Sequence, residues 1–311
     1  MAKRKQKNPQ AYLKTIYILT GIILAQSFLL LASCPRRNTT ASLKSELVKI
    51  EEPPQRLQQK ERVQQEKIQS APRQKEQVKE QKITIPQETV NAKIAIVLDD
   101  WGYSFNNVKF LREIEVPLTL AILPHRGYSE AIAKTALALH KETILHLPLE
   151  PHQEQKSHLE PDTIVTIMPK EQVLKILDSG IKSVLGIKGI SNHMGSKATE
   201  SKPLMKIIFT ELKRRKLYFL DSFTGKTVCK DLAKEVGISY ARRQVFLDNK
   251  NESSYILGQV ELLAKIAKQS GYAIGIGHDR QKTLEVLVKA IPELKKRGYQ
   301  FVGVSELLKE Q

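Results

Sequence analysis

The chain has 311 residues and a formal net charge of +17, while aromatic side chains make up only 6% of the sequence. Much of the excess charge lies in the first ninety residues, and no basic stretch is interleaved with aromatic side chains that could stack on bases. We therefore expect no nucleic-acid partner. Attraction to an anionic membrane or cell-wall polymer explains the charge at least as well.

The N-terminal segment combines a basic leader with an uncharged apolar run. The run covers residues 15–34 and is flanked by basic residues on both sides. About twenty apolar residues are enough to span a bilayer, and a basic leader favours a cytoplasmic N-terminus. We expect residues 1–37 to form an export signal or a membrane anchor that tethers the rest of the chain on the extracytoplasmic side of the membrane.

Cys34 is a candidate lipidation site. Residues 31–34, Leu-Ala-Ser-Cys, resemble a bacterial lipobox, in which the signal is cleaved before the cysteine and the thiol is lipidated. Pro35 follows directly and the basic leader is long, so an uncleaved single-pass anchor is an equal alternative. The second cysteine, Cys229, lies in an apparently structured segment, and two cysteines offer little scope for a disulfide framework.

Residues 38–91 are rich in Gln, Glu, Lys and Pro and contain almost no clusters of aromatic or large apolar side chains. Burial of such a segment cannot offset the entropy cost of ordering it, so we expect a disordered linker. A short coiled coil over residues 57–68 is the alternative, although its apolar seam is thin.

From residue 92 onward, short apolar runs alternate with charged helical stretches, which predicts one folded domain over residues 92–311. The candidate strands are residues 94–98, 118–123, 143–146, 187–190, 217–220, 244–247, 273–276 and 301–304. Most of them are separated by helices. We therefore expect an α/β fold with a closed or nearly closed barrel of about seven to eight mostly parallel strands.

Polar residues able to do chemistry follow several of these strands, where the sites of parallel α/β folds lie. Asp99 and Asp100 directly follow the first strand, and adjacent buried carboxylates are costly unless a positive charge such as a divalent metal lies between them. Helix capping before Trp101 is the alternative role. His146 ends a later strand and His193 lies in a turn of small residues, so Asp100 and two histidines form a candidate metal-ligand set.

The chain has seven histidines, so other combinations have to be considered. His152 lies six residues after His146 and is the main rival as a ligand. Further polar residues that follow strands are Asp221, Asp248 and the pair His278 and Asp279. We expect their side chains to lie at the same edge of the barrel as the candidate metal ligands.

Five segments together resemble the divergent polysaccharide deacetylase family over nearly all of residues 92–308. The longest covers residues 277–307 and is similar to the closing motif of polysaccharide deacetylases. The others are Ile-Val-Leu-Asp-Asp at 96–100, His-Leu-Pro-Leu-Glu-Pro at 146–151, Asn-His-Met-Gly-Ser at 192–196 and Phe-Leu-Asp-Ser at 219–222. The resemblance implies a distorted (β/α) barrel, in agreement with the strand count.

The resemblance also implies roles for individual residues. In the broader superfamily the first aspartate of the pair is the general base, the second binds a divalent metal together with two histidines, and a late histidine is the acid. Carried over, the base is Asp99, the acid is His278, and the ligands, for a metal such as zinc, are Asp100, His146 and His193. Candidates for orienting His278 or contacting the substrate are Asp221, Asp279 and Asn192.

Two features depart from the family pattern. The usual deacetylases place both ligand histidines four residues apart, whereas Glu150 stands at that spacing after His146. The second histidine ligand is therefore His193, as the divergent family implies, or His152. The usual arginine-proline motif after the histidine box is also missing.

The sequence thus predicts a membrane-tethered, metal-dependent amide hydrolase that removes N-acetyl groups from a cell-envelope polysaccharide. The alternative is a non-catalytic envelope protein that keeps a deacetylase-like barrel to bind glycan or to act as a scaffold, motivated by the missing arginine motif and the long tether. A metal-dependent hydrolase of a different bond is a third hypothesis, because a metal site does not by itself identify the substrate.

Overall fold

The computed structural model describes residues 91–152 and 159–308. The predicted membrane segment with Cys34 and nearly all of the predicted linker lie outside the described residues, so these assignments and the domain boundaries stay predictions. No helix within the described ranges combines the length and the apolar character needed to cross a bilayer.

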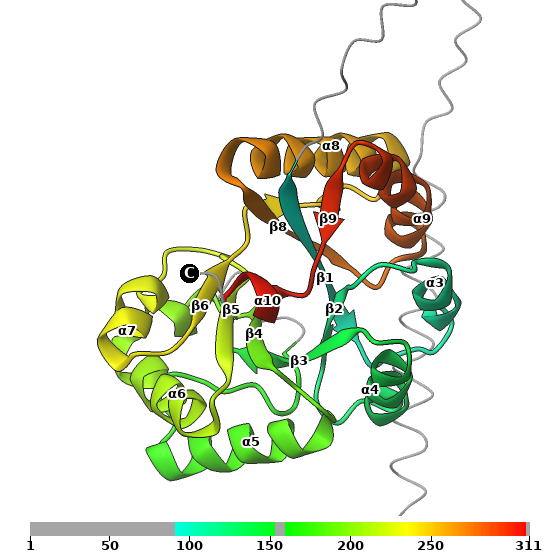
Figure 1. The fold of residues 1–311 in the computed structure, drawn as a ribbon. Coiled ribbons are helices and arrows are strands. Elements are labelled where there is room, and N and C mark those ends of the chain that lie inside the picture. The colour runs from blue at the N-terminus through cyan, green and yellow to red at the C-terminus, as the bar shows by residue number, and fades with distance from the viewer. Residues whose placement is uncertain (1–90, 153–158, 309–311) are drawn as a thin grey trace, which may run out of the picture. The chain divides into compact units, whose positions relative to one another are not determined.

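The fold is built on one sheet of nine strands whose recorded pairings are all parallel. The strands are β1 (Ala92–Trp101), β2 (Thr119–Ile122), β3 (Glu142–Leu149), β4 (Gly189–Met194), β5 (Tyr218–Asp221), β6 (Tyr240–Arg242), β7 (Val245–Phe246), β8 (Tyr272–His278) and β9 (Tyr299–Phe301). Their order is β6-β5-β4-β3-β2-β1-β8-β7, and β9 pairs with the beginning of β1. The sheet curls into an incomplete barrel surrounded by helices (Figure 1).

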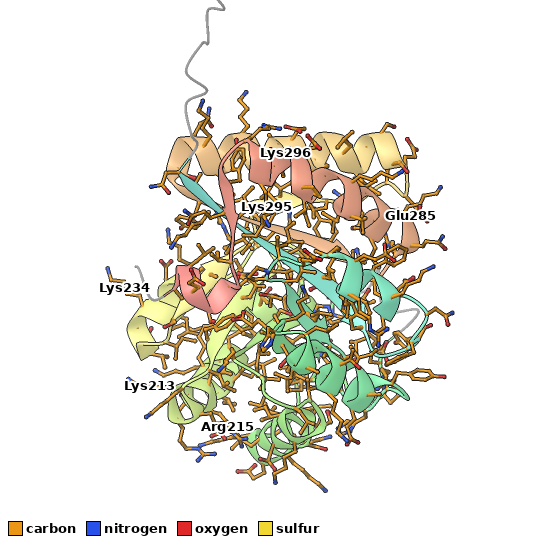
Figure 2. The ribbon with its side chains drawn as sticks, turned by 45° about the vertical axis from the view of Figure 1, so that its right-hand side comes forward. Lys213, Arg215, Lys234, Glu285, Lys295 and Lys296 are labelled. Carbon is orange, nitrogen blue, oxygen red and sulfur yellow. The ribbon has the colours of Figure 1, made fainter. Side chains whose placement is uncertain are left out.

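The helices fill most connections between strands. They are α3 (Val108–Glu113), α4 (Ser129–Ala138), α5 (Lys170–Ser183), α6 (Lys202–Arg215), α7 (Cys229–Val236), α8 (Ser253–Ser270), α9 (Gln281–Lys296) and α10 (Val304–Leu307), with a short 3₁₀ helix η2 (Ala198–Glu200). Their outward faces carry exposed charges such as Lys213 on α6, Lys234 on α7 and Lys296 on α9 (Figure 2). These lysines belong to the surface-like helical charge recognised in the sequence.

Strand β1 shows how the core forms two layers. Ile94, Ile96 and Leu98 pack in the layer between the sheet and the helices, whereas Ala95 and Val97 pack in the barrel interior. The interior layer is completed by side chains of α10, which lies within the ring of strands (Figure 1). A strand buried on both faces requires a continuous apolar run, and residues 94–98 supply one.

The predicted fold of parallel strands is confirmed as an incomplete, curled barrel, with three differences in detail. His193, expected in a turn, lies within β4. Strand β6 was missed because it has three residues and only Ala241 among them is buried. The last strand ends at Phe301, and Val304 instead begins α10. Because the strands are parallel, their carboxyl ends meet at one edge, and the predicted site residues lie there.

Candidate metal centre

Strand β1 ends in an irregularity that presents two neighbouring carboxylates to the same place. The pairing of β1 with β2 shifts its register between Leu98 and Trp101, and Asp100 has a φ of 66°. Side chains of a regular strand alternate between faces, so adjacent aspartates would point apart without such a bulge. Here Asp99 Oδ2 lies 3.6 Å and Asp100 Oδ1 lies 3.3 Å from the same atom, His146 Nε2.

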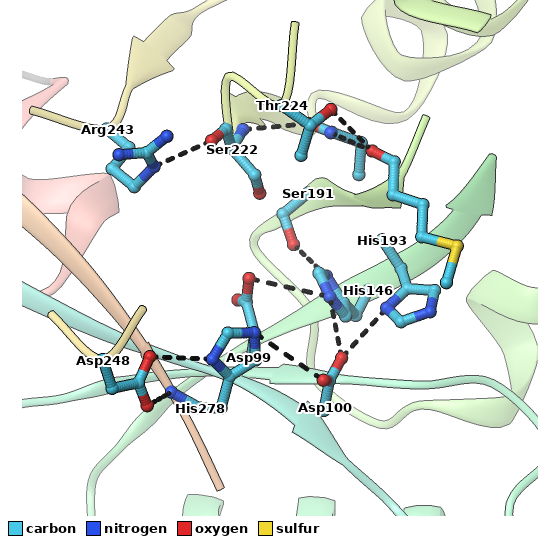
Figure 3. Close-up of polar contacts among 12 residues, drawn as sticks. Asp99, Asp100, His146, Ser191, His193, Ser222, Thr224, Arg243, Asp248 and His278 are labelled. Atoms are coloured by element: carbon cyan, nitrogen blue, oxygen red, sulfur yellow. Dashed lines mark hydrogen bonds and ion pairs between the residues drawn. The ribbon is translucent and has the colours of Figure 1, made fainter. Parts of the chain in front are cut away.

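Three side chains from three strands converge beside this bulge (Figure 3). Asp100 Oδ1 also lies 2.9 Å from His193 Nδ1, and one ligand atom of each residue lies within 4.8 Å of those of the other two. His146 comes from β3 and His193 from β4, which pair in parallel. One aspartate and two histidines at this separation fit a divalent metal ion that keeps positions open for water and substrate.

The contacts of the histidines show which of the two candidates for the second histidine ligand, His193 or His152, lies in the cluster. His146 Nδ1 lies 2.8 Å from Ser191 Oγ, the kind of contact that fixes the ring of a metal-binding histidine. His152 Nε2 instead lies 3.3 Å from Glu200 Oε2, and its side chain is 52% exposed. The structure therefore brings His193, and not His152, to Asp100 and His146.

The protonation states of this set suit metal binding. Burial raises the pKa of Asp100, but hydrogen bonds from His146 and His193 and the charges of both rings outweigh burial and hold that pKa well below its usual range. Burial lowers the pKa of His146 to about 4, against the opposing hydrogen bond to Asp100. At neutral pH the set thus offers a carboxylate and a neutral imidazole, the forms that coordinate a metal.

Asp99 provides a second sign that the centre fits a ligand. The residue is only 3% exposed, and its Oδ1 has no hydrogen-bond partner among the described residues. Burial and the charges of Asp100 and Asp248 raise the pKa of Asp99, and the charge of Arg243 opposes them. An unpaired buried oxygen is costly, and beside three ligand-type side chains it fits a hydrated cation.

His278, at the end of β8, lies against the same cluster. Its Nε2 is 3.8 Å from Asp100 Oδ2, and its Nδ1 is 2.8 Å from Asp248 Oδ1. Burial raises the pKa of Asp248, but hydrogen bonds from His278 and Thr283 outweigh burial and lower it. The ionised Asp248 therefore accepts the Nδ1 hydrogen bond and leaves Nε2 of His278 directed toward the centre.

The carboxylates expected to orient His278 have other partners. Asp221 accepts hydrogen bonds from a backbone N–H at 2.8 Å and from the Tyr240 hydroxyl at 3.0 Å, and Asp279 accepts one from Asn107 Nδ2 at 2.7 Å. The structure thus corrects the expectation that Asp221 or Asp279 orients His278, because Asp248 is the carboxylate in contact with the ring, whereas a substrate contact by Asp221 or Asp279 stays a prediction. The sequence showed Asp248 only as one more polar strand terminus.

Asn192 has a structural role at the carboxyl edge of the sheet. Its Nδ2 donates to the Met194 carbonyl at 2.7 Å, and its Oδ1 accepts the backbone N–H of Ser222 at 2.9 Å. The side chain therefore joins the end of β4 to the loop after β5, and it positions the strand that carries His193.

The two departures from the usual pattern have structural counterparts. Glu150, at the spacing of the missing histidine, accepts hydrogen bonds from Lys197 Nζ at 2.9 Å and from Thr166 Oγ1 at 2.7 Å, so it belongs to the scaffold. Arg243, in the connection between β6 and β7, donates to Ser222 O at 2.8 Å, and its charge acts on Asp99. An arginine from another part of the chain thus lies near the first aspartate.

Comparison with known proteins identifies the family and the fold of the chain. Residues 96–308 match the family described as divergent polysaccharide deacetylase. The uncharacterized Escherichia coli protein YibQ is 33% identical over 219 residues, which cover 70% of this chain and 68% of YibQ. The crystal structure of an uncharacterized Agrobacterium tumefaciens protein shares the fold, with a TM-score of 0.66 at 24% identity over 70% of this chain and 89% of that chain.

A shorter match reaches a protein with a named activity. A peptidoglycan-N-acetylglucosamine deacetylase of Bacillus cereus is 61% identical over 33 residues, which are 11% of this chain and 16% of that protein. The extended match over residues 96–308 and the extended identity to YibQ decide the relationship. This chain belongs to the divergent polysaccharide deacetylase family.

Proposed function

We propose that the chain is a metal-dependent deacetylase that removes N-acetyl groups from a cell-envelope polysaccharide. The observation that carries the proposal is the convergence of Asp100, His146 and His193 next to the unpaired, buried carboxylate oxygen of Asp99. Family membership supports a deacetylase-like protein, and the donor set supports a metal such as zinc, which accepts one carboxylate and two imidazoles.

The proposed ligands are Asp100, His146 and His193. A metal ion held by them would act as a Lewis acid on the acetamide and would favour ionisation of a water molecule. Ser191 and Asp248 are the supporting groups, because each holds the ring nitrogen of a histidine that faces away from the centre.

Two side chains would move protons in the reaction. Water adds to the acetamide carbon and Asp99 accepts a proton from that water. His278, which has to carry a proton on both ring nitrogens for this step, donates its Nε2 proton to the sugar nitrogen as the carbon–nitrogen bond breaks, and the proton held by Asp99 then restores that of His278. The products are acetate and a free amino sugar. The buried position of Asp99 beside the ligands and the Asp248 contact that orients His278 support these two roles.

A glycan that contains N-acetylated amino sugars is the substrate we propose, and the named activity of the Bacillus cereus relative makes peptidoglycan the first candidate. We propose a membrane-tethered, extracytoplasmic position for the domain, supported by the apolar run at residues 15–34 and its basic flanks. Such a position would bring the site to envelope polymers.

The test compares the purified full-length chain with His193→Ala and with His152→Ala as the matched control. We expect about one bound transition metal ion per wild-type and His152→Ala chain, and at least a tenfold loss of metal affinity for His193→Ala. Acetate release from N-acetylglucosamine oligomers should follow the metal content. Equal metal binding by all three proteins would refute the ligand set, and a metal-loaded wild type that releases no acetate from any N-acetylated glycan would refute the activity.

A further inference from the structure

Four aromatic side chains of the described residues are exposed, and all four lie in loops at the carboxyl edge of the sheet. Tyr103 and Phe105 follow β1, Tyr128 follows β2 and Phe223 follows β5, with exposures of 55%, 37%, 46% and 41% in that order. The other aromatic side chains in the described ranges are buried or partly buried. Exposed rings gathered at one edge indicate a binding surface.

Tyr103, Phe105 and Tyr128 form the first aromatic group, on the loops after β1 and β2. The rings of Phe105 and Tyr128 lie 6.1 Å apart, and a backbone hydrogen bond of 3.0 Å from Tyr128 to the loop of Tyr103 joins the two loops. The Tyr103 hydroxyl hydrogen-bonds to Glu160, and the Arg126 guanidinium lies 6.0 Å from the Tyr103 ring. These contacts fix the rings while leaving much of their surface in water.

Phe223 forms the second group on the loop after β5. Its φ is 53°, in the left-handed region that a bulky side chain rarely adopts. The conformation is held by a hydrogen bond of 2.8 Å from its N–H to Asp221 and one of 3.1 Å from Arg243 to its carbonyl, and the Arg242 guanidinium lies 4.5 Å from the ring. Strained residues that the surrounding contacts maintain gather at functional sites.

The two groups flank the metal centre in the order of the sheet. From the strand before Phe223 to the strand before Tyr103 the order is β5-β4-β3-β2-β1 (Figure 1). The ligands His193 and His146 come from β4 and β3, two of the three strands in between, and Asp100 comes from β1. A ligand that reaches both groups would therefore cross the ends of the strands that carry the histidines.

We propose that the two aromatic groups bind sugar rings of one glycan chain on either side of the sugar that enters the metal centre. The inference rests on the proposed function and names the side chains that would hold the neighbouring sugars of its polysaccharide substrate. Pyranose rings present flat faces of C–H groups that pack on aromatic rings, while their hydroxyl groups need hydrogen-bond partners. Arg126 and Glu160 beside the first group and Arg242 beside Phe223 provide such partners.

The experiment measures the binding of β-1,4-linked N-acetylglucosamine oligomers of increasing length, from the single sugar upward, to the full-length chain by calorimetry. We expect the affinity of the wild type to rise with chain length and then level off. Tyr128→Ala and Phe223→Ala should each weaken binding of the long oligomers about three- to tenfold, the range of one aromatic contact. Tyr128→Phe keeps the ring and should bind like the wild type, as should Leu262→Ala, which removes a similarly exposed side chain on α8.

Metal content and acetate release from the same proteins separate this inference from the proposed function. Length-dependent binding that needs the rings, in a protein that releases no acetate, would support the aromatic groups and refute the activity. An active protein whose affinity does not depend on chain length, or whose Tyr128→Ala and Phe223→Ala variants bind long oligomers as tightly as the wild type, would overturn the inference and leave the activity standing. Unchanged metal content in the variants shows that the centre is still folded.

Discussion

Both edges of the sheet hold buried carboxylates, but among the described residues only Asp99, at the carboxyl edge, leaves a buried carboxylate oxygen without a hydrogen-bond partner. At the amino edge Glu142 accepts hydrogen bonds from Thr119 Oγ1 at 3.0 Å and from the Tyr218 hydroxyl at 2.7 Å, and also from the backbone and hydroxyl of Ser305. At the carboxyl edge Asp99 Oδ1 has no partner in the described ranges. A carboxylate with its acceptor sites filled serves the fold, whereas one left incomplete is kept for a ligand.

The contrast extends beyond these two residues. The buried side-chain atoms without partners in the described part of the chain belong to Asp99, Trp101 and Ser222, and all three residues follow or end strands at the carboxyl edge. Left-handed backbone at non-glycine residues occurs at the same edge in Asp100, His125, Met194 and Phe223, and at the amino edge in His140 and Lys216, which follow the helices α4 and α6. Unsatisfied polar atoms and strain both cost stability, so their occurrence together at the carboxyl edge indicates a selected function.

The largest effect should come from removing the proposed base. Asp99→Asn keeps the size of the side chain but removes its ability to accept a proton, so we expect acetate release to fall by about 10²- to 10⁴-fold. Metal content should stay that of the wild type, because the ligands are untouched. The exposed Asp231→Asn serves as the control, and an Asp99→Asn protein with wild-type turnover would contradict the base assignment.

A smaller loss of activity should follow when His278, the proposed acid, loses the charge that orients its ring. Asp248 is a positioning residue, and Asp248→Asn removes the charge that holds His278 Nδ1, so we expect kcat to fall about tenfold to a hundredfold with little change in KM. Thr283→Val is the matched control, because Thr283 donates to the other oxygen of Asp248 at 2.7 Å without touching the ring. Equal losses of kcat in the two variants would mean that Asp248 acts only through stability.

Asp248 also shows where prediction from the sequence ends. The apolar runs and the polar residues after them were enough to predict parallel strands and to gather Asp100, His146 and His193 at one edge. The partner of His278 lies thirty residues earlier in the chain, beyond all of α8, and the choice among Asp221, Asp248 and Asp279 depends on strand register. Register follows from tertiary pairing, which a strand-end pattern does not contain.

The sequence did not predict the bulge in β1 either. Adjacent aspartates in a regular strand point to opposite faces, so the sequence alone left helix capping open for Asp99 and Asp100. The extra residue between Leu98 and Trp101 turns both side chains toward His146. No residue type in that segment predicts the bulge. Their position after a buried strand identified the pair as a candidate metal site, the family resemblance assigned a role to each, and the backbone geometry explains how both carboxylates reach one site.

At the amino edge a substitution should change stability and leave the chemistry intact. Glu142→Gln replaces an acceptor oxygen with an amide that faces the donors of Ser305, so we expect the free energy of unfolding to fall by about 1–3 kcal/mol. Urea unfolding monitored by circular dichroism measures the loss. Metal content and acetate release should match the wild type under conditions in which the variant is folded. A loss of activity in the folded variant would show that the amino edge also serves the chemistry, and would contradict the difference between the two edges.

The smallest expected effect tests whether strain is stored at the carboxyl edge. Glycine adopts a positive φ without penalty, so Phe223→Gly should recover about 1–2 kcal/mol of backbone strain, which offsets the lost ring contact with Arg242 and the greater entropy of the unfolded chain. We therefore expect a change in unfolding free energy within about 1 kcal/mol of zero. Phe105→Gly, at an exposed ring whose backbone is not left-handed, recovers no strain and should destabilise the protein more. Should urea unfolding show Phe223→Gly to be the more damaging of the two, the Phe223 backbone stores no strain that glycine relieves, and its left-handed conformation no longer supports a functional role for the exposed ring.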